Sequence, residues 1–87
     1  MSSIQEETYR TIGKNIKKYR LKANLSQEKL SEILDVNNKF IGHVERFERY
    51  ISLKKLIQIS KILDVPLKEF FDFEQKYFIT DNKRNTG

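Results

Sequence analysis

The side chains of this sequence that could take part in chemistry exclude several kinds of site. The chain has no cysteine and one histidine, His43, so it offers no thiol nucleophile, no thiolate metal site and no pair of histidines for a metal. It also contains no glycine-rich phosphate loop and no plausible acid–base pair. We therefore expect a protein that is not an enzyme and that needs neither a metal nor another cofactor.

Positive charge is concentrated in the middle of the chain. The net charge is +5, and residues 10–55 carry twelve Lys and Arg against five Asp and Glu, whereas the rest of the chain carries five against seven. Between Thr8 and Gln27 there are six basic side chains and no acidic one. A one-sided positive charge suits a polyanion such as nucleic acid, although a solvated basic helix face would give the same pattern.

The sequence has no feature that directs the chain to a membrane or out of the cell. No apolar run approaches the roughly 18 residues of a membrane span, and residues 1–10 lack the basic-then-apolar order of a signal peptide. We expect a cytoplasmic protein with one domain over residues 1–78 and a flexible polar tail over residues 79–87.

The spacing of apolar residues predicts five helices and no strand. Ile12, Ile16 and Tyr19 form one apolar stripe of a first helix over about 8–23. Ser26, Asn37 and Ser52 are suited to cap helices over 27–34, from the Asn37 cap to about 46, and over 53–63, and Pro66 is suited to begin a fifth. In the second, third and fourth helices the residues expected to face inward are Leu30, Ile33, Leu34, Ile41, Val44, Leu53, Leu56, Ile57 and Leu63, with Phe40 at the rim.

A repeated tetrapeptide marks two of the helix ends. Ile-Leu-Asp-Val occurs at 33–36 and again at 62–65. We interpret Asp35 and Asp64 as left-handed residues that end a helix, each followed by a valine that folds back onto the preceding turn. Asn24 is expected to end the first helix in the same conformation.

Two short helices joined by a three-residue turn, at about 26–46, are a helix-turn-helix candidate. The surrounding sequence resembles the lambdoid phage repressor and Cro family, the xenobiotic-response-element (XRE) type of helix-turn-helix regulator, over about residues 12–71. The resemblance is carried by Ile12-Gly13, Ile16, Arg20, Leu25-Ser26-Gln27-Glu28, Leu30, Leu34-Asp35-Val36, Ile41, Glu45-Arg46, Ser52-Leu53, Leu56, Ile59-Ser60, Leu63-Asp64-Val65, Leu67 and Phe70-Phe71.

This resemblance implies an all-α, five-helix, repressor-like DNA-binding fold and a role for particular residues. The third helix would be the recognition helix, with Asn38, Lys39 and His43 reading bases in the major groove of double-stranded DNA, and Gly42 would let the backbone approach the groove. Arg20 and Glu45 would form a partly buried ion pair rather than two unrelated surface charges. The residues expected to contact phosphates are Gln27, Asn37, Arg46, Arg49 and Lys54.

Two positions depart from the family pattern. Phe47 stands where the family usually has glycine, and Ile51 where it often has proline. Phenylalanine is a poor left-handed residue, so we expect the third helix either to run on by about a turn or to be followed by a loop on another path.

The resemblance implies a sequence-specific transcriptional regulator, which we expect to be a dimeric repressor or a controller protein of a restriction–modification system that binds a palindromic operator. The alternative is a protein-interaction module of the same fold, such as an antitoxin or the partner of an anti-repressor. The excess of aromatic residues near the C-terminus predicts a homodimer interface, made by Phe70, Phe73, Tyr77 and Phe78. The alternative is that Phe73, Tyr77 and Phe78 fold back onto their own domain.

Overall fold

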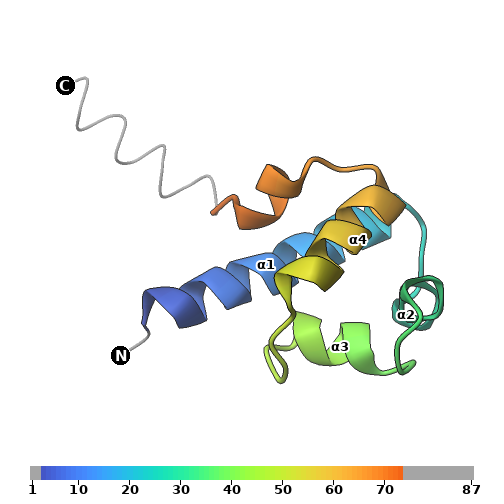
Figure 1. The fold of residues 1–87 in the computed structure, drawn as a ribbon, viewed down its shortest axis with the longest axis horizontal. Helices are drawn as coiled ribbons and strands as arrows, with labels where there is room; N and C mark the ends of the chain where they lie inside the picture. The colour runs from blue at the N-terminus through green and yellow to red at the C-terminus, as the bar shows by residue number, and fades with distance from the viewer. Residues whose placement is uncertain (1–2, 74–87) are drawn as a thin grey trace.

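The computed structural model describes residues 3–73, which form four α-helices and one short 3-10 helix (Figure 1). Five helices were expected, and the fifth is a 3-10 helix. The elements are α1 (Ile4–Lys22), α2 (Gln27–Leu34), α3 (Phe40–Glu45), α4 (Leu53–Leu63) and the 3-10 helix η1 (Leu67–Phe71). The expected tail over residues 79–87 lies outside the described residues.

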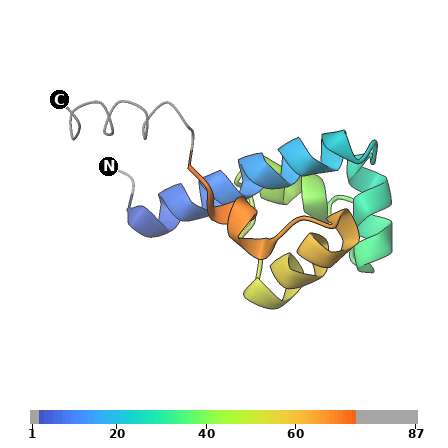
Figure 2. The ribbon, with the colours of Figure 1, turned by 90° about the horizontal axis from the view of Figure 1, so that it is seen from above.

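Helix α1 begins earlier than expected because a capping box precedes its apolar stripe. The Ser3 hydroxyl accepts a hydrogen bond from the Glu6 backbone N–H, and the Glu6 carboxylate accepts one from the Ser3 N–H. Each bond satisfies a donor that a helix start leaves unpaired. In both ribbon views the N-terminal part of α1 therefore extends beyond the other helices (Figure 2).

The helix ends use left-handed residues as the sequence predicts. Asn24, Asp35 and Asp64 have φ values of 60°, 63° and 56°. After each aspartate, the N–H of the following valine donates to a carbonyl five residues back, at 3.0 Å for Val36 and 2.9 Å for Val65. Both helices, α2 and α4, therefore end at the residue predicted.

The core is a cluster of apolar side chains that all five elements share. Helix α1 packs against α3 and η1, while α2 packs against α3 and α4. Three residues expected to be buried are instead exposed: Ile33 is 45% exposed, Leu53 60% and Ile57 36%. The buried apolar residues are Ile12, Ile16, Leu30, Leu34, Phe40, Ile41, Val44, Ile51, Leu56, Ile59, Leu63 and Phe70.

The short helix η1 is held against α1 by one aromatic anchor and one amide. Phe70 is fully buried and meets the Tyr19 ring edge-on. This burial corrects the expectation that Phe70 lies in a dimer interface, because its side chain fills the chain's own core. The Asn15 amide donates to the carbonyls of Phe70 and Asp72 at 3.1 and 2.9 Å, which fixes the end of η1 on α1.

Tyr19 also bonds to η1 through its hydroxyl, which donates to a Glu69 carboxylate oxygen at 3.1 Å. Burial raises the pKa of the Tyr19 phenol above its ordinary value of 10.0, and the hydrogen bond to Glu69 and the negative charges of Glu69 and Asp72 raise it further.

The described helices include none that is long and apolar enough to cross a bilayer.

Candidate nucleic-acid interface

The hydroxyl groups of two serines stabilise the helix-turn-helix that α2 and α3 form. The Ser26 hydroxyl caps α2 by accepting from the Lys29 N–H at 2.9 Å. Ser31, which is fully buried on α2, accepts from the Ile41 N–H at 3.2 Å. The Ile41 N–H lies in the first turn of α3, where backbone donors have no partner within the helix. Sequence reasoning missed the role of Ser31, since an interior serine gives no signal of its own.

Helix α3 begins later than expected. The Asn37 side chain accepts from the Lys39 N–H at 2.9 Å, and its carbonyl accepts from the Phe40 N–H at 2.9 Å. Asn37 therefore orders a turn that leads into the helix, and the regular helix starts at Phe40. Asn38 and Lys39, the expected base readers, lie exposed in that turn.

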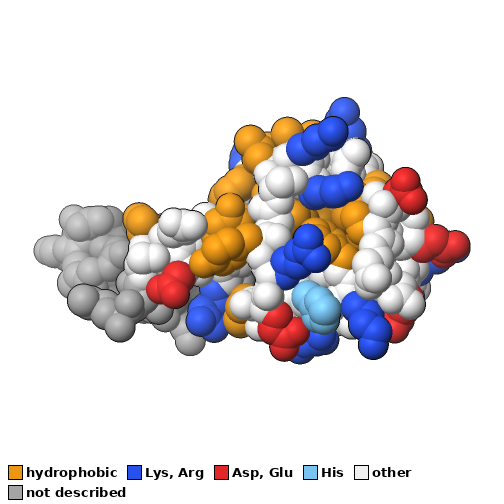
Figure 3. Space-filling view, turned by 60° about the horizontal axis from the view of Figure 1, so that its bottom comes forward, with side chains coloured by type: hydrophobic (Ala, Val, Ile, Leu, Met, Phe, Trp, Pro, Cys, Tyr) orange, Lys and Arg blue, Asp and Glu red, His pale blue; other side chains and the backbone are white. Residues whose placement is uncertain are grey.

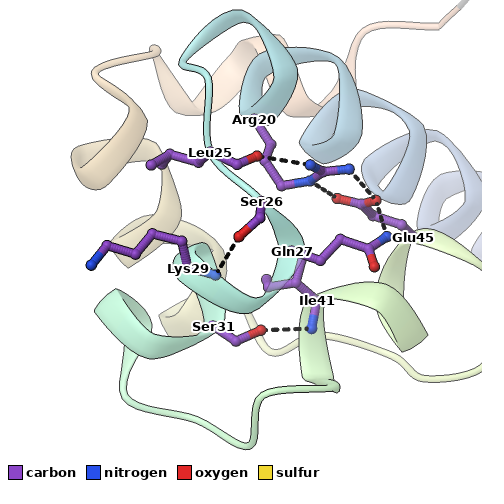
Figure 4. A network of polar contacts seen from close by, with 8 residues as sticks. All are labelled: Arg20, Leu25, Ser26, Gln27, Lys29, Ser31, Ile41 and Glu45. Atoms are coloured by element: carbon purple, nitrogen blue, oxygen red, sulfur yellow. Dashed lines mark hydrogen bonds and ion pairs between the residues drawn. The ribbon is translucent and has the colours of Figure 1, made fainter.

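A buried ion pair ties α1 to α3. The Arg20 guanidinium donates to both carboxylate oxygens of Glu45, from Nε at 2.7 Å and from Nη2 at 3.0 Å. Their side chains are only 7% and 2% exposed. Nη1 of Arg20 donates to the Leu25 carbonyl at 2.8 Å, and the Gln27 amide donates to Glu45 at 2.9 Å (Figure 4). Residues from α1, α2 and α3 thus meet at one carboxylate.

The exposed end of α3 carries a second, solvent-facing cluster of charges. The Arg46 guanidinium lies 3.3 Å from a Glu48 carboxylate oxygen, and the His43 imidazole lies 4.0 Å from the other. All three side chains are between 40% and 54% exposed. An exposed contact of this kind adds little stability, so these side chains can exchange partners with a ligand.

Helix α3 ends at Glu45, and Phe47 adopts the left-handed conformation that we expected it to avoid. Its φ is 65°, and the Glu48 N–H donates to the His43 carbonyl at 2.8 Å. The strain of about 1–2 kcal/mol for a left-handed residue with a side chain is opposed by contacts of the ring. The Arg10 guanidinium lies 4.4 Å from the ring centroid, and the ring packs over Gly13, where an added Cβ would lie 3.2 Å from it.

The loop between α3 and α4 places the remaining expected contacts. Arg49 lies over the buried Phe40 ring at 5.2 Å, and Tyr50 stacks on Tyr9 with ring centroids 4.4 Å apart. Ile51, at the position where the family often has proline, is 3% exposed and belongs to the core. Lys54 is exposed in the first turn of α4.

Gly42 is covered by side chains, contrary to the expectation that it leaves the α3 backbone open to a DNA groove. A Cβ built on Gly42 would lie 3.0 Å from the Gln27 amide oxygen and 3.1 Å from Nη1 of Arg46. The space that glycine leaves is therefore bordered by two of the expected phosphate-contacting side chains.

The face of the molecule that carries α3 is predominantly basic. In Figure 3, Lys and Arg side chains lie around the single histidine, which also has an acidic side chain beside it, while further acidic side chains lie toward the edges of this view. Arg10 joins this region through Phe47, a placement that its position in the sequence did not reveal. Within residues 3–73, no three acidic or histidine side chains come together as the ligands of a metal ion would.

Comparison with known proteins identifies several relatives. A family model described as Helix-turn-helix matches residues 16–70. The control protein C.BamHI of Bacillus amyloliquefaciens is 40% identical over 63 residues, which are 71% of this chain and 78% of the relative. The control protein C.SmaI of Serratia marcescens is 43% identical over 53 residues, 61% of this chain, and the match spans only 63% of C.SmaI.

A solved structure also resembles this chain. The crystal structure of the restriction-modification controller protein C.AhdI from Aeromonas hydrophila superposes with a TM-score of 0.67 at 28% sequence identity. The superposition covers 72% of this chain and 96% of C.AhdI. The helix order and the packing of the described helices are therefore those of a known protein fold.

Proposed function

This chain belongs to the helix-turn-helix family, and from that premise we propose that it is a sequence-specific DNA-binding transcriptional regulator, not an enzyme. Within the family we assign it to the controller type, because its relatives C.SmaI and C.BamHI are named control proteins and the similar structure of C.AhdI is that of a restriction-modification controller protein.

The observation that carries this proposal is how firmly α3 is held while its outer side stays exposed. The Arg20–Glu45 pair and the Ser31 hydroxyl fix α3 to α1 and α2. On the other side, Asn38, Lys39 and His43 face solvent wholly or in part. An asparagine can bond adenine through two atoms and a lysine can donate to guanine, so we assign base reading to these residues.

Side chains around α3 supply the contacts to phosphates in this proposal. They come from the start of α2, from the turn before α3, from the end of α3 and the loop that follows it, and from the start of α4, so they would straddle the groove that α3 enters. Donors of this kind position a protein on the duplex without reading its sequence. The residues are Gln27, Asn37, Arg46, Arg49 and Lys54.

We propose that the protein acts as a homodimer, with the interface moved from Phe70 to the exposed apolar side of α4. Leu53 and Ile57 lie one helical turn apart and are 60% and 36% exposed. Leu53 and Phe71, which is 37% exposed, line an open cleft of about 260 Å³. Apolar side chains gathered in this way are typical of interfaces. Phe73 follows at 37% exposure, while Tyr77 and Phe78 lie outside the described residues.

The dimer matters for function because a single recognition helix contacts few base pairs. A two-fold dimer would place two copies of α3 about 34 Å apart, one turn of DNA, and would match a palindromic operator.

Salt dependence of DNA binding tests the proposed function without knowledge of the operator. Affinity for a mixed-sequence duplex, measured by fluorescence anisotropy, should fall steeply with salt, with a log–log slope of about −0.9 per phosphate contact. Arg46→Ala and Arg49→Ala should each weaken binding and make the slope shallower by about that amount.

Lys68→Ala is the matched control, since Lys68 is an exposed cation on η1, an element that packs on α1 and α4. It should leave the slope near that of the wild type. A wild-type affinity that does not change with salt would contradict DNA binding and favour a protein-interaction module.

A further inference from the structure

Gly42 is an unusual residue for its position. It lies in the six-residue helix α3, where glycine is less favourable than alanine. Its conformation gives no reason for this choice, because no glycine of the described chain has a positive φ. Gly42 is also buried, although it has no side chain of its own. The reason for glycine at this position must therefore be sought in the side chains that cover it.

Two polar side chains from different places in the chain cover Gly42. An added Cβ would lie 3.0 Å from Oε1 and 3.5 Å from Cδ of Gln27, and 3.1 Å from Nη1 of Arg46. The contacts with Oε1 of Gln27 and Nη1 of Arg46 are a few tenths of an ångström shorter than a carbon atom normally accepts. The Gln27 amide and the Arg46 guanidinium therefore both lie where a side chain at position 42 would have to fit.

Each of the two covering groups is held at its other side by a carboxylate. The Gln27 amide donates to Glu45 at 2.9 Å, and Glu45 is the anion of the buried pair with Arg20. Nε of Arg46 lies 3.3 Å from Glu48 on the surface. The Gln27 amide is therefore held between Glu45 and Gly42, with little freedom to move away from a new methyl group. Arg46, which has only an exposed partner, has more.

We propose that Gly42 is a positioning residue, which seats the Gln27 amide beside the Arg46 guanidinium so that the two donate to the same stretch of DNA phosphates. This role rests on the DNA-binding function proposed above and refines it. Glu45 takes one N–H of the Gln27 amide, and a primary amide has a second N–H to donate. The buried pair thereby fixes a phosphate donor on the surface, and glycine is the residue that leaves room for it.

Gly42→Ala tests this role because a structural role and a positioning role predict different results. Alanine favours the helix, which offsets the weakened bond between Gln27 and Glu45, so the variant should remain folded, with a midpoint of urea unfolding close to that of the wild type. Its affinity for mixed-sequence duplex DNA should fall by about three- to tenfold, the order of one lost hydrogen bond. Gly42→Val, which adds two more carbons, should bind more weakly still.

Gly13→Ala is a matched substitution with the opposite expected pattern. There the added Cβ would lie 2.7 Å from the Val44 carbonyl oxygen, a backbone atom that cannot turn aside, so this variant should lose stability. A stable Gly42→Ala beside a destabilised Gly13→Ala would separate the two uses of glycine on neighbouring helices.

A double-mutant cycle with Gln27→Ala identifies the group through which Gly42 acts. Once the Gln27 side chain is removed, Gly42→Ala should cost little further affinity, because the methyl group then has room. The double variant also tests the inference if Gly42→Ala alone folds poorly, since the double variant should fold and bind DNA as Gln27→Ala does.

Three results would overturn the inference. Unchanged affinity in Gly42→Ala would show that the two donors do not depend on glycine. An equal loss in the presence and absence of Gln27 would show that the methyl group meets the DNA itself. A wild type with no affinity for duplex DNA would remove the proposed function along with the inference, whereas the first two results leave that function standing.

Discussion

Replacing Arg20 by methionine removes the cation of the buried pair and keeps a side chain of similar length. Glu45, whose side chain is 2% exposed, would then keep only the Gln27 amide as a partner, and the Leu25 carbonyl would lose its donor. Leaving one charge of a buried pair unpaired costs about 3–5 kcal/mol. The free energy of unfolding of a small domain is about 5–15 kcal/mol, so we expect Arg20→Met to lose a large part of the stability of this domain.

Urea unfolding and thermal unfolding, each followed by circular dichroism, measure this loss. A domain of this size loses about 4–8 °C in Tm per kcal/mol, so the variant should melt more than about 12 °C below the wild type. Arg20→Met combined with Glu45→Met should recover much of the loss, because apolar residues can replace a buried pair at little cost.

Lys29→Met provides the control, because Lys29 and Glu32 form a pair at 3.3 Å whose side chains are 56% and 72% exposed. Its loss should stay below about 0.5 kcal/mol. The reasoning would be refuted if Arg20→Met were as stable as the control, or if the double variant were no more stable than Arg20→Met alone.

Three further outcomes follow from particular contacts. Phe47→Gly should be more stable than Phe47→Ala by about 1 kcal/mol in urea unfolding, because both lose the ring and only glycine relieves the left-handed strain; equal stabilities would contradict this. The raised pKa of Tyr19 means that the fold favours the neutral phenol, so its stabilising effect is complete below pH 10.0 and is lost as the pH rises through the higher, folded pKa. Tyr19→Phe should therefore lose less stability than the wild type between pH 9 and 11, approximately one unit either side of the ordinary value. Equal losses in the two proteins would contradict a contribution of the Tyr19 phenol to this pH dependence. Leu53→Lys with Ile57→Lys should sediment as a monomer with unchanged helix content, and a wild type that is already monomeric at tens of micromolar would exclude the proposed interface.

The parts of the fold that could be predicted from the sequence depend on local chemistry. Ser26 and Ser52 cap their helices, and Asp35 and Asp64 end them, through bonds that span only a few residues. For that reason the bounds of α2 and α4 were predicted to the residue. The pairing of Arg20 with Glu45 came from the family resemblance, because nothing local joins two residues that are 25 positions apart.

The features that were not predicted depend on what lies against a residue in space. Periodicity identifies Leu53 as apolar but does not say whether another element covers it. Phe47 is held in a strained conformation by contacts with α1, which no rule of local propensity contains. The expectation for Gly42 was wrong for the same reason, since one of the groups that cover it, Gln27, belongs to another helix.

Selection of bound sequences from a pool of random duplex DNA is the most direct measurement of the central claim, that α3 reads bases as part of a two-fold dimer. We expect one enriched motif with two inverted half-sites whose centres lie about 10 base pairs apart. With Asn38→Ala or Lys39→Ala, preference at one position of each half-site should relax by about 1–3 kcal/mol, while binding to random duplex stays close to that of the wild type. Recovery of sequences with no common motif by the folded wild-type protein would contradict sequence-specific recognition by α3.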